Sequence, residues 1–314
     1  MEKALFDLVK KYDVITLYRH VSPDSDALGS QFGLKQWILD TYPSKRVYAL
    51  GTIEQNNKNS CYPVADEVDD ETVKQSLAII LDTANTPRVD DQRFKIADYR
   101  LKIDHHIVVE EYAEASIVDP KKGATCEILA RLFEQEGYTL SAPCAQYLYG
   151  GLIADTLRFS IQTTSANTLR AAAYLVDCGA NVTKANEDNF STSLEIYQYE
   201  NFLRSKVQVR ENKLAYCIVC KEEYDAFGLT FNEAKDKVYV MGGVHEFESW
   251  ILFTEKERNE DNEILYSASL RSKRTPIDDI ANKYGGGGHH LACGCRGLTM
   301  EDVESILKDI LERI

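Results

Sequence analysis

The chain has 314 residues, of which 44% are hydrophobic, and its formal net charge at pH 7 is −14. This length accommodates two domains of ordinary size. Such an acidic chain is unsuited to a broad surface for long duplex nucleic acid, because neutralising phosphates requires clustered Lys and Arg. The chain begins MEKALF, which is not a secretory signal, and contains no long apolar run. We therefore expect a cytoplasmic protein without a membrane span.

Short apolar runs alternate with helical patterns in the first half of the chain. We expect strands over residues 14–18, 46–50, 77–81 and 99–103, and helices over residues 27–40, 124–136, 142–154 and 165–177. This alternation predicts an α/β fold with a doubly wound, mainly parallel sheet. Ligands of such sheets bind beyond the carboxyl ends of the strands. The residues that follow these strands are therefore candidates for a functional site.

The second half begins with a polar stretch that carries apolar residues at helical spacing, and we expect a linking helix there. Further strands are expected over residues 214–219, 249–253 and 264–270, and a helix over residues 277–283. An amphipathic helix ends the chain, and Thr299 and Asp302 form its capping box. The expected organisation is a first domain over residues 1–188, a linker over residues 189–212, and a smaller α/β domain with a mixed sheet over residues 213–314.

Aspartates and histidines follow several of the apolar stretches, and His20, Asp82 and Asp104 come directly after, or at the end of, predicted strands. The set comprises His20, Asp24, Asp26, Asp82, Asp104, His105, His106 and Asp155. A single His-His pair or Asp-x-Asp triplet is usually incidental, but their joint occurrence at strand ends is not. Four Asp and two or three His can hold two divalent metal ions, and such a pair of ions is a device for phosphoester hydrolysis.

Two other motifs allow more than one interpretation. The run Gly285–Gly288 is either a flexible loop or a set of backbone amides that close around a phosphate, since a helix precedes it and we expect a short helix to start after it. Cys217 and Cys220 have the spacing of half a zinc knuckle, but they fall on a predicted strand, where positions three apart face opposite sides. Reduced thiols are the better interpretation.

These motifs resemble those of the DHH phosphoesterase superfamily, named for the motif that is here Asp104, His105 and His106. The glycine run, followed by His289 and later Ala292-Cys293-Gly294, is similar to the signature of its associated C-terminal domain. More narrowly, the chain resembles the group that combines nanoRNA exonuclease and 3'-phosphoadenosine 5'-phosphate phosphatase activities. The resemblance implies hydrolysis by a metal-activated water in a cleft between the two domains.

The resemblance also implies two Mn²⁺ ions, for which Mg²⁺ or Co²⁺ could substitute. It assigns His20, Asp24 and Asp82 to the first ion. The second ion would bind Asp26, Asp82, His105 and Asp155, with Asp82 bridging. Mixed imidazole and carboxylate ligands suit Mn²⁺ better than Mg²⁺.

The expected catalytic residues are Asp82, Asp104 and His106. His106 would contact phosphoryl oxygens or support the leaving group. Asp104 would orient a neighbouring group, with a capped turn as the equally good alternative.

Phosphate and nucleotide recognition is expected mainly from the second domain. The substrate-binding set comprises His106, Arg158, Arg271, Gly286, Gly287, Gly288 and His289. The alternative for Arg271 is a surface charge at a strand end. Ser25 and Leu157 depart from the family pattern, in which glycine is common at these positions, and this leaves the exact substrate open.

The favoured substrates are short oligoribonucleotides and phosphorylated adenosine nucleotides, with no membrane and no long duplex as partner. The main alternative is a phosphodiesterase for linear dinucleotides (pApA or pGpG) from cyclic-dinucleotide turnover. A non-catalytic nucleotide sensor is less favoured, because all six expected metal positions are present. A single-strand exonuclease and an inorganic pyrophosphatase are also less favoured, and a homodimer is left open.

Overall fold

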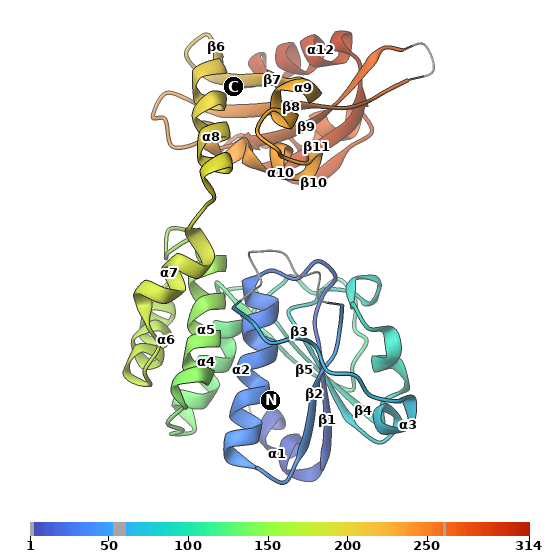
Figure 1. The fold of residues 1–314 in the computed structure, drawn as a ribbon, viewed down its shortest axis with the longest axis vertical. Coiled ribbons are helices and arrows are strands. Elements are labelled where there is room, and N and C mark those ends of the chain that lie inside the picture. Colours follow the sequence, from blue (N-terminus) through green and yellow to red (C-terminus); the bar gives the residue numbers. More distant parts are fainter. Residues whose placement is uncertain (1–2, 53–60, 260–261) are drawn as a thin grey trace. The chain divides into compact units, whose positions relative to one another are not determined.

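The computed structural model describes residues 3–52, 61–259 and 262–314. The chain divides into two units, Met1–Ser191 and Thr192–Ile314, each with its own sheet (Figure 1). The first sheet is parallel and the second is mixed, so the predicted α/β class is confirmed.

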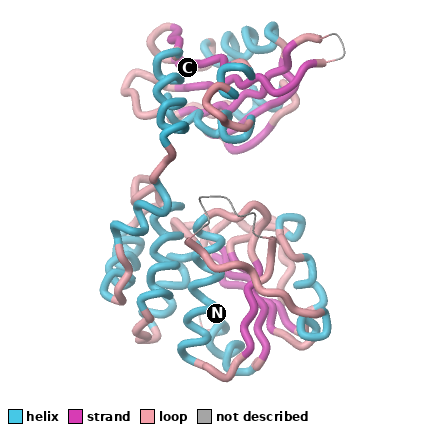
Figure 2. The backbone as a smooth tube through the Cα atoms, in the orientation of Figure 1, coloured by secondary structure: helices cyan, strands magenta, loops and turns pink. Residues whose placement is uncertain are grey.

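Five parallel strands form the first sheet, in the order β2-β1-β3-β4-β5. They are β1 (Val14–Tyr18), β2 (Arg46–Ala49), β3 (Leu77–Leu81), β4 (Tyr99–Asp104) and β5 (Ala115–Val118). Figure 2 shows the strands of this unit in magenta beside its helices in cyan. Strands β1 and β3 are buried along their whole length, as expected where both faces of a parallel sheet are covered. The chain order reverses after β2, because β3 pairs with the other edge of β1. The carboxyl ends of β1 and β3 therefore flank the point where open α/β sheets bind ligands.

Helices cover both faces of this sheet. They are α1 (Ala4–Lys11), α2 (Ser25–Thr41), α3 (Asp70–Lys74), α4 (Thr125–Gln135), α5 (Ala142–Asp155), α6 (Ala166–Asp177) and α7 (Val182–Phe190), with 3-10 turns η2 (Thr86–Arg88) and η3 (Gln92–Ile96). On one face, Leu17 packs in a core with Trp37 of α2 and Phe133 of α4. On the other face, Tyr18 packs against Phe94 of η3. The doubly wound arrangement predicted from the sequence is thus present.

The four predicted strands of the first unit are present, but β5 was missed. It is a four-residue strand that is only partly buried, so it lacks the continuous apolar run that marks a buried strand. The predicted linking helix is interrupted, since α7 ends at Phe190 and α8 spans Leu194–Lys206. Ser193 starts α8, because its hydroxyl accepts a hydrogen bond from the backbone N–H of Ile196. Helix α8 belongs to the second unit.

Six strands form the second sheet, in the order β10-β11-β9-β8-β7-β6. They are β6 (Gln208–Arg210), β7 (Leu214–Val219), β8 (Ser249–Arg258), β9 (Ile264–Ser272), β10 (Gly287–His289) and β11 (Ala292–Leu298). Strands β7 and β8 are parallel, and the other neighbours are antiparallel. The remaining elements are α9 (Lys221–Asp225), α10 (Phe231–Lys235), η4 (Asp236–Met241), α11 (Asp278–Lys283) and α12 (Met300–Leu311).

Two cores hold the second unit together. On one face of the sheet, Ile306 and Leu307 of α12 pack with Phe253. On the other face, Tyr199 of α8 packs with Leu252. The predicted capping box at the start of α12 is present, because Thr299 and Asp302 hydrogen-bond each other's backbone N–H groups.

Part of the glycine run is a strand rather than a flexible loop, and its contact with a phosphate stays a prediction. Gly287–His289 is an edge strand, β10, that pairs with β11, and the element that follows it is β11 rather than the expected short helix. Close approach to β11 requires the absence of side chains here. A Cβ on Gly286 would lie 2.1 Å from the carbonyl oxygen of Gly294, and Gly288 has a positive φ of 139°. Sequence periodicity could not anticipate a strand in a run without side chains.

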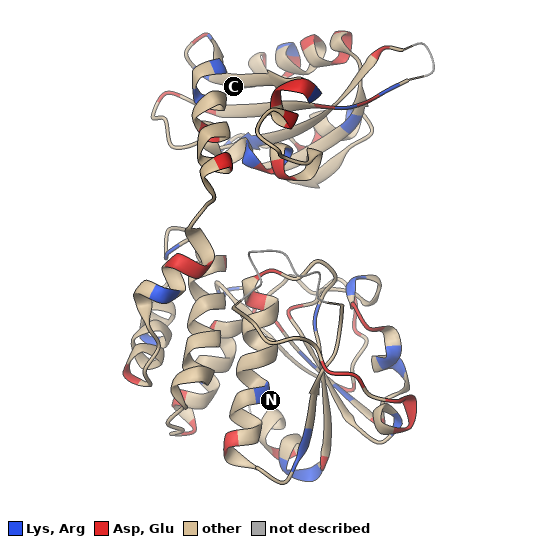
Figure 3. Ribbon diagram, viewed as in Figure 1, with Lys and Arg blue, Asp and Glu red and all other residues tan. Residues whose placement is uncertain are grey.

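Three general properties complete the fold. Within the described ranges, no helix is long and apolar enough to cross a membrane. All eight cysteines are free, and Cys217 is buried on β7. Among the described residues, Lys and Arg are interspersed with Asp and Glu in both units and do not gather into one basic stripe in the view of Figure 3.

Candidate metal centre

The histidines and aspartates singled out in the sequence converge at the carboxyl edge of the first sheet. His20 follows β1, Asp82 follows β3, and Asp104 ends β4. Asp24 and Asp26 stand at the start of α2, and Asp155 is the last residue of α5. The topology thus brings together residues that are more than 130 positions apart.

The first group of possible metal ligands is His20, Asp24 and Asp82, whose ligand atoms lie within 4.8 Å of one another. The Nε2 of His20 is 3.6 Å from Oδ2 of Asp24 and 3.5 Å from Oδ2 of Asp82. The Nδ1 of His20 lies 2.8 Å from the carbonyl oxygen of Val21. Because a carbonyl only accepts, Nδ1 is the donor, and Nε2 is the nitrogen left to face a metal ion, which is the usual arrangement of a metal-binding histidine.

The second group is Asp26, His105 and Asp155. The Nε2 of His105 is 3.3 Å from Oδ2 of Asp155, 3.9 Å from Oδ2 of Asp26 and 3.4 Å from Oδ1 of Asp82. The Nδ1 of His105 faces the carbonyl oxygen of Lys122 at 3.3 Å. Asp82 therefore turns one carboxylate oxygen to each group, as a bridging ligand requires.

These separations fit metal ions better than direct hydrogen bonds. Two atoms that bind one ion at about 2.1–2.2 Å lie about 3.0–3.6 Å apart, depending on the coordination angle. The measured separations of 3.3–3.9 Å fall in or near this range. The Nε2 of His105 is also buried without a hydrogen-bond partner among the described residues, and such an atom normally has one. The residues present thus fit two divalent cations.

The start of helix α4 holds two of the carboxylates. Asp26 accepts hydrogen bonds from the backbone N–H of Thr125 at 2.6 Å and of Cys126 at 2.9 Å. The hydroxyl of Thr125 donates to Oδ1 of Asp82 at 3.1 Å. Asp82 itself has a positive φ of 53°, a strained conformation for a residue with a side chain. Sequence reasoning missed Thr125, because backbone donors at a helix start leave no mark in a sequence pattern.

The electrostatics of the centre favour added positive charge. Burial and the negative charges of Asp82 and Asp155 raise the pKa of Asp26 well above its usual range. Burial lowers the pKa of His20, but the carboxylates of Asp24 and Asp82 outweigh it and raise the pKa to about 10. The pKa of His105 is raised to about 12 in the same way, chiefly by Asp155 and Asp82. Protons and divalent cations therefore compete for this centre.

His106 lies beside these groups and is held by Asp104. The Oδ1 of Asp104 accepts from Nδ1 of His106 at 2.8 Å and from its backbone N–H at 3.1 Å. Buried Lys102 lies 3.1 Å from the other oxygen of Asp104. Burial raises the pKa of Asp104, but His106 and Lys102 outweigh it and lower the pKa to about 2. The carboxylate of Asp104 thus caps the turn and hydrogen-bonds the His106 ring, while its role in catalysis stays a prediction.

Comparison with known proteins decides the family. Residues 14–152 match the model described as DHH family, N-terminal domain. The bifunctional oligoribonuclease and PAP phosphatase NrnA of Bacillus subtilis is 34% identical over 313 residues, which cover 99% of this chain and 97% of that protein. The chain belongs to the DHH family. A probable NrnA of Streptococcus mutans is 32% identical and covers 99% of both chains.

A solved structure shares this fold. The exopolyphosphatase-related protein of Bacteroides fragilis superposes with a TM-score of 0.83 over 99% of this chain and 95% of that chain, at 22% identity. The match to the NrnA proteins extends beyond the DHH model into the second unit. It also includes Asp155, which lies just outside residues 14–152.

Arg158, a predicted substrate residue of this DHH protein, contacts residues of helix α7. Its Nε donates to Asn186 of α7 at 2.9 Å, and its guanidinium lies 3.8 Å above the ring of Phe190. The preceding Leu157 has a positive φ of 45° and is exposed, in a conformation that glycine adopts more easily. A substrate role for Arg158 stays a prediction.

Two predicted substrate residues of the second unit share one face of its sheet. His289 of β10 and Arg271 of β9 each pair with Ala292 of β11 from opposite sides. Directly paired residues of antiparallel strands project to the same face. The Cα atoms of Arg271 and His289 are thus separated by two strand spacings, or about 10 Å. Arg271 is partly buried, and burial lowers its pKa.

Proposed function

We propose that this protein is a metal-dependent phosphoesterase that hydrolyses short oligoribonucleotides and 3'-phosphoadenosine 5'-phosphate. The observation that supports this most directly is the orientation of the Asp82 carboxylate, which turns one oxygen to His20 and the other to His105. Full-length similarity to the NrnA proteins of Bacillus subtilis and Streptococcus mutans supports the reaction and its substrates. An intact set of six ligands argues against a non-catalytic sensor.

The metal ligands in this proposal are those of the two groups. His20, Asp24 and Asp82 hold one cation, and Asp26, Asp82, His105 and Asp155 hold the other. The mixture of imidazole and carboxylate favours Mn²⁺, with Mg²⁺ or Co²⁺ as substitutes. Two such ions supply an activated water at neutral pH and stabilise charge on the phosphoryl oxygens.

The chain's own residues then orient the substrate. The Nδ1 of His106 donates to Asp104, which fixes the ring and leaves Nε2 for a phosphoryl oxygen or the leaving group. The side chain of His106 is 38% exposed, whereas that of His105 is 15% exposed. This difference favours substrate contact for His106 and metal binding for His105. Asp104 acts by positioning His106, and Lys102 balances its charge.

The net negative charge of the molecule favours short substrates over long ones. The chain carries 50 acidic and 36 basic residues, so it offers little grip for a long polyanion. Arg271, His289 and the glycines at positions 286–288 are proposed to bind the phosphate and sugar of the substrate, with Arg271 as a charged donor. Linear dinucleotides such as pApA remain the alternative, because they present the same phosphodiester and terminal phosphate.

A substrate panel tests this function. We would assay the full chain with Mn²⁺ on 3'-phosphoadenosine 5'-phosphate, pApA, oligoribonucleotides of two to ten units, and pyrophosphate. The proposal expects turnover of the bisphosphate and of the shortest oligoribonucleotides. A preference for pApA over both would favour the alternative. Turnover of pyrophosphate alone, or no turnover with any divalent cation, would overturn the proposal.

A further inference from the structure

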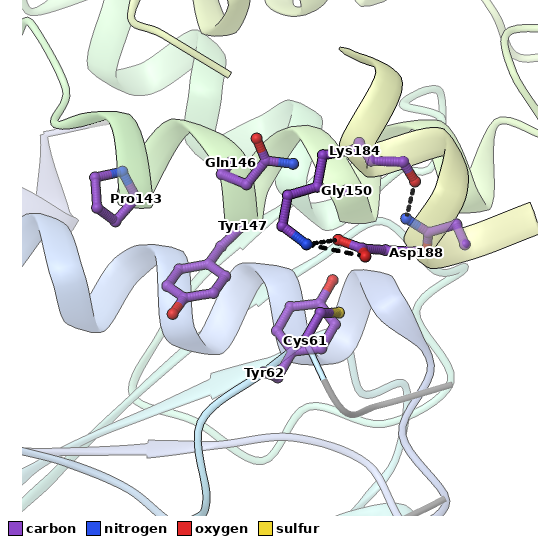
Figure 4. A pocket seen from close by; sticks show the side chains of 10 residues that line it. Cys61, Tyr62, Pro143, Gln146, Tyr147, Gly150, Lys184 and Asp188 are labelled. Carbon is purple, nitrogen blue, oxygen red and sulfur yellow. Dashed lines mark hydrogen bonds and ion pairs between the residues drawn. The ribbon is translucent and has the colours of Figure 1, made fainter. Parts of the chain in front are cut away.

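The first unit contains a pocket that none of the metal-site residues lines. It has a volume of about 220 Å³ and lies between α5, α7 and the segment that contains Cys61 and Tyr62. Figure 4 shows the rings of Tyr62 and Tyr147 on one side and the Lys184–Asp188 ion pair on the other. The pocket is smaller than typical sites for drug-sized ligands, which measure about 300–1,000 Å³. It therefore suits one ring system and excludes an oligonucleotide.

One wall of the pocket is aromatic and held in place. The rings of Tyr62 and Tyr147 stack at 5.7 Å with an interplanar angle of 27°. Phe32 of α2 supports both, at 6.3 Å from Tyr62 and 6.1 Å from Tyr147. The hydroxyl of Tyr62 donates to the carbonyl oxygen of Ser25 at 3.1 Å. A preorganised aromatic wall of this kind binds a planar ring with little ordering cost.

The floor of the pocket is kept open by Gly150. Glycine is unfavourable in the interior of a helix such as α5, so its presence calls for a reason. A Cβ at this position would lie 3.3 Å from the hydroxyl oxygen of Tyr62 and 3.7 Å from Nδ2 of Asn189. The missing side chain thus preserves both the approach of Tyr62 and the space in front of it.

The other wall is polar but carries no net charge. Lys184 pairs with Asp188 at 2.8 Å, so it is poorly available for a phosphate. The Nδ2 of Asn189 donates to the carbonyl oxygen of Ala185 at 2.8 Å. Carboxylate and amide oxygens at this wall can accept hydrogen bonds from the edge of a base. These features favour a neutral, planar, amino-bearing ring over an anion.

We propose that this pocket binds the base of a purine nucleoside, at a site separate from the metal centre. Stacking on Tyr62 and Tyr147 supplies most of the binding, and Asp188 and Asn189 accept hydrogen bonds from the edge of the base. The phosphate of a nucleotide is not required, because the polar wall is neutral.

Adenosine is the probe, because it lacks the phosphate that the metal centre would hold. Titration calorimetry on the full chain, stripped of metal, compares the wild type with Tyr147→Ala and Tyr147→Phe. We expect Tyr147→Ala to weaken binding about tenfold or more, because base stacking on an aromatic side chain contributes a factor of that size. Tyr147→Phe keeps the ring and should bind as the wild type does. Uridine should bind more weakly than adenosine.

No binding of adenosine, equal binding by Tyr147→Ala, or tighter binding of uridine would overturn the proposal. Photolabelling of the wild type with 8-azidoadenosine provides a test that does not depend on the stability of a variant. Peptide mapping should find the label near Tyr62 or Tyr147. Labelling confined to peptides outside the pocket would equally overturn it.

Discussion

The hydroxyl of Thr125 donates to Asp82 at 3.1 Å, while the backbone N–H of the same residue donates to Asp26 at 2.6 Å. Asp82 and Asp26 belong to different ligand groups, so one residue at the start of α4 fixes carboxylates on both sides of the proposed centre. The positive end of the helix dipole adds to this effect, because it favours negative charge at a helix start.

Replacing Thr125 by Val should weaken metal binding without unfolding the protein. Valine has the same shape but no hydroxyl, so Asp82 loses a donor that orients it. A hydrogen bond to a charged group contributes about 1.5–3 kcal/mol, which corresponds to about a tenfold to hundredfold weaker Mn²⁺ affinity. Calorimetric titration with Mn²⁺ measures this loss. Thr125→Ser is the matched control and should retain most of the affinity. Unchanged affinity in Thr125→Val would remove Thr125 from the positioning role.

Replacing Asp82 by Ala should abolish turnover while the protein stays folded. Asp82 is the carboxylate that faces both ligand groups, so its loss should break the pair of ions and lower kcat by about three orders of magnitude or more. Metal analysis should find fewer than two ions per chain. Asp119→Asn is the control, because Asp119 also follows a strand of this sheet but belongs to neither ligand group. A folded Asp82→Ala protein with more than about a tenth of wild-type activity would contradict the assignment.

Some elements of this chain could be predicted from the sequence more accurately than others. Strands β1 and β3 were predicted to the residue, because a buried parallel strand is a continuous apolar run with sharp polar ends. The residues after those strands converge because the topology requires it, and so His20, Asp82 and Asp104 could be grouped in advance.

Other features depend on contacts that no local pattern records. Thr125 acts through a backbone N–H and one hydroxyl. Lys102 is a buried partner of Asp104, although it lies on a strand that alternates apolar and charged residues. Arg158 was predicted to reach the cleft because it comes just after Asp155, but its contact with α7 through a left-handed turn over residues 157–159 could not be predicted. The pocket beside Tyr62 combines residues from three segments and has no sequence signature.

Mn²⁺ binding should release protons at pH 7. The pKa values of His20 and His105 are raised to about 10 and about 12, so both rings hold a proton that a metal ion must displace at this pH. The apparent affinity should therefore rise with pH and fall with acidification. Calorimetry in buffers of different ionisation enthalpy counts the protons, and we expect at least one released per chain. Proton uptake, or an affinity that falls as pH rises from 6 to 8, would contradict this account.

Replacing Arg271 by Ala should weaken substrate binding without affecting the metals. Arg271 and His289 flank Ala292 on one face of the second sheet, so they are placed to hold one phosphate or sugar group together. Loss of a charged hydrogen bond to phosphate, about 1.5–3 kcal/mol, should raise KM by roughly one to two decades. The value of kcat and the metal content should stay close to those of the wild type. Steady-state kinetics on a series of oligoribonucleotides measures both parameters.

Two further variants decide whether Arg271 and His289 act together. The double variant Arg271→Ala/His289→Ala should lose less than the sum of the single losses, since residues that bind the same group are not additive. Arg258→Ala is the charge control, because Arg258 lies on β8 at the far end of its pairing with β9. It should leave KM within about twofold, since surface substitutions away from a site have small effects.

In the wild type, kcat/KM should be highest for substrates of about two to four nucleotides and fall as chains lengthen, because an acidic surface offers longer chains no further favourable contacts. Equal efficiency on a dinucleotide and a twenty-residue RNA, with no effect of Arg271→Ala, would instead indicate a general exonuclease whose second unit does not select length.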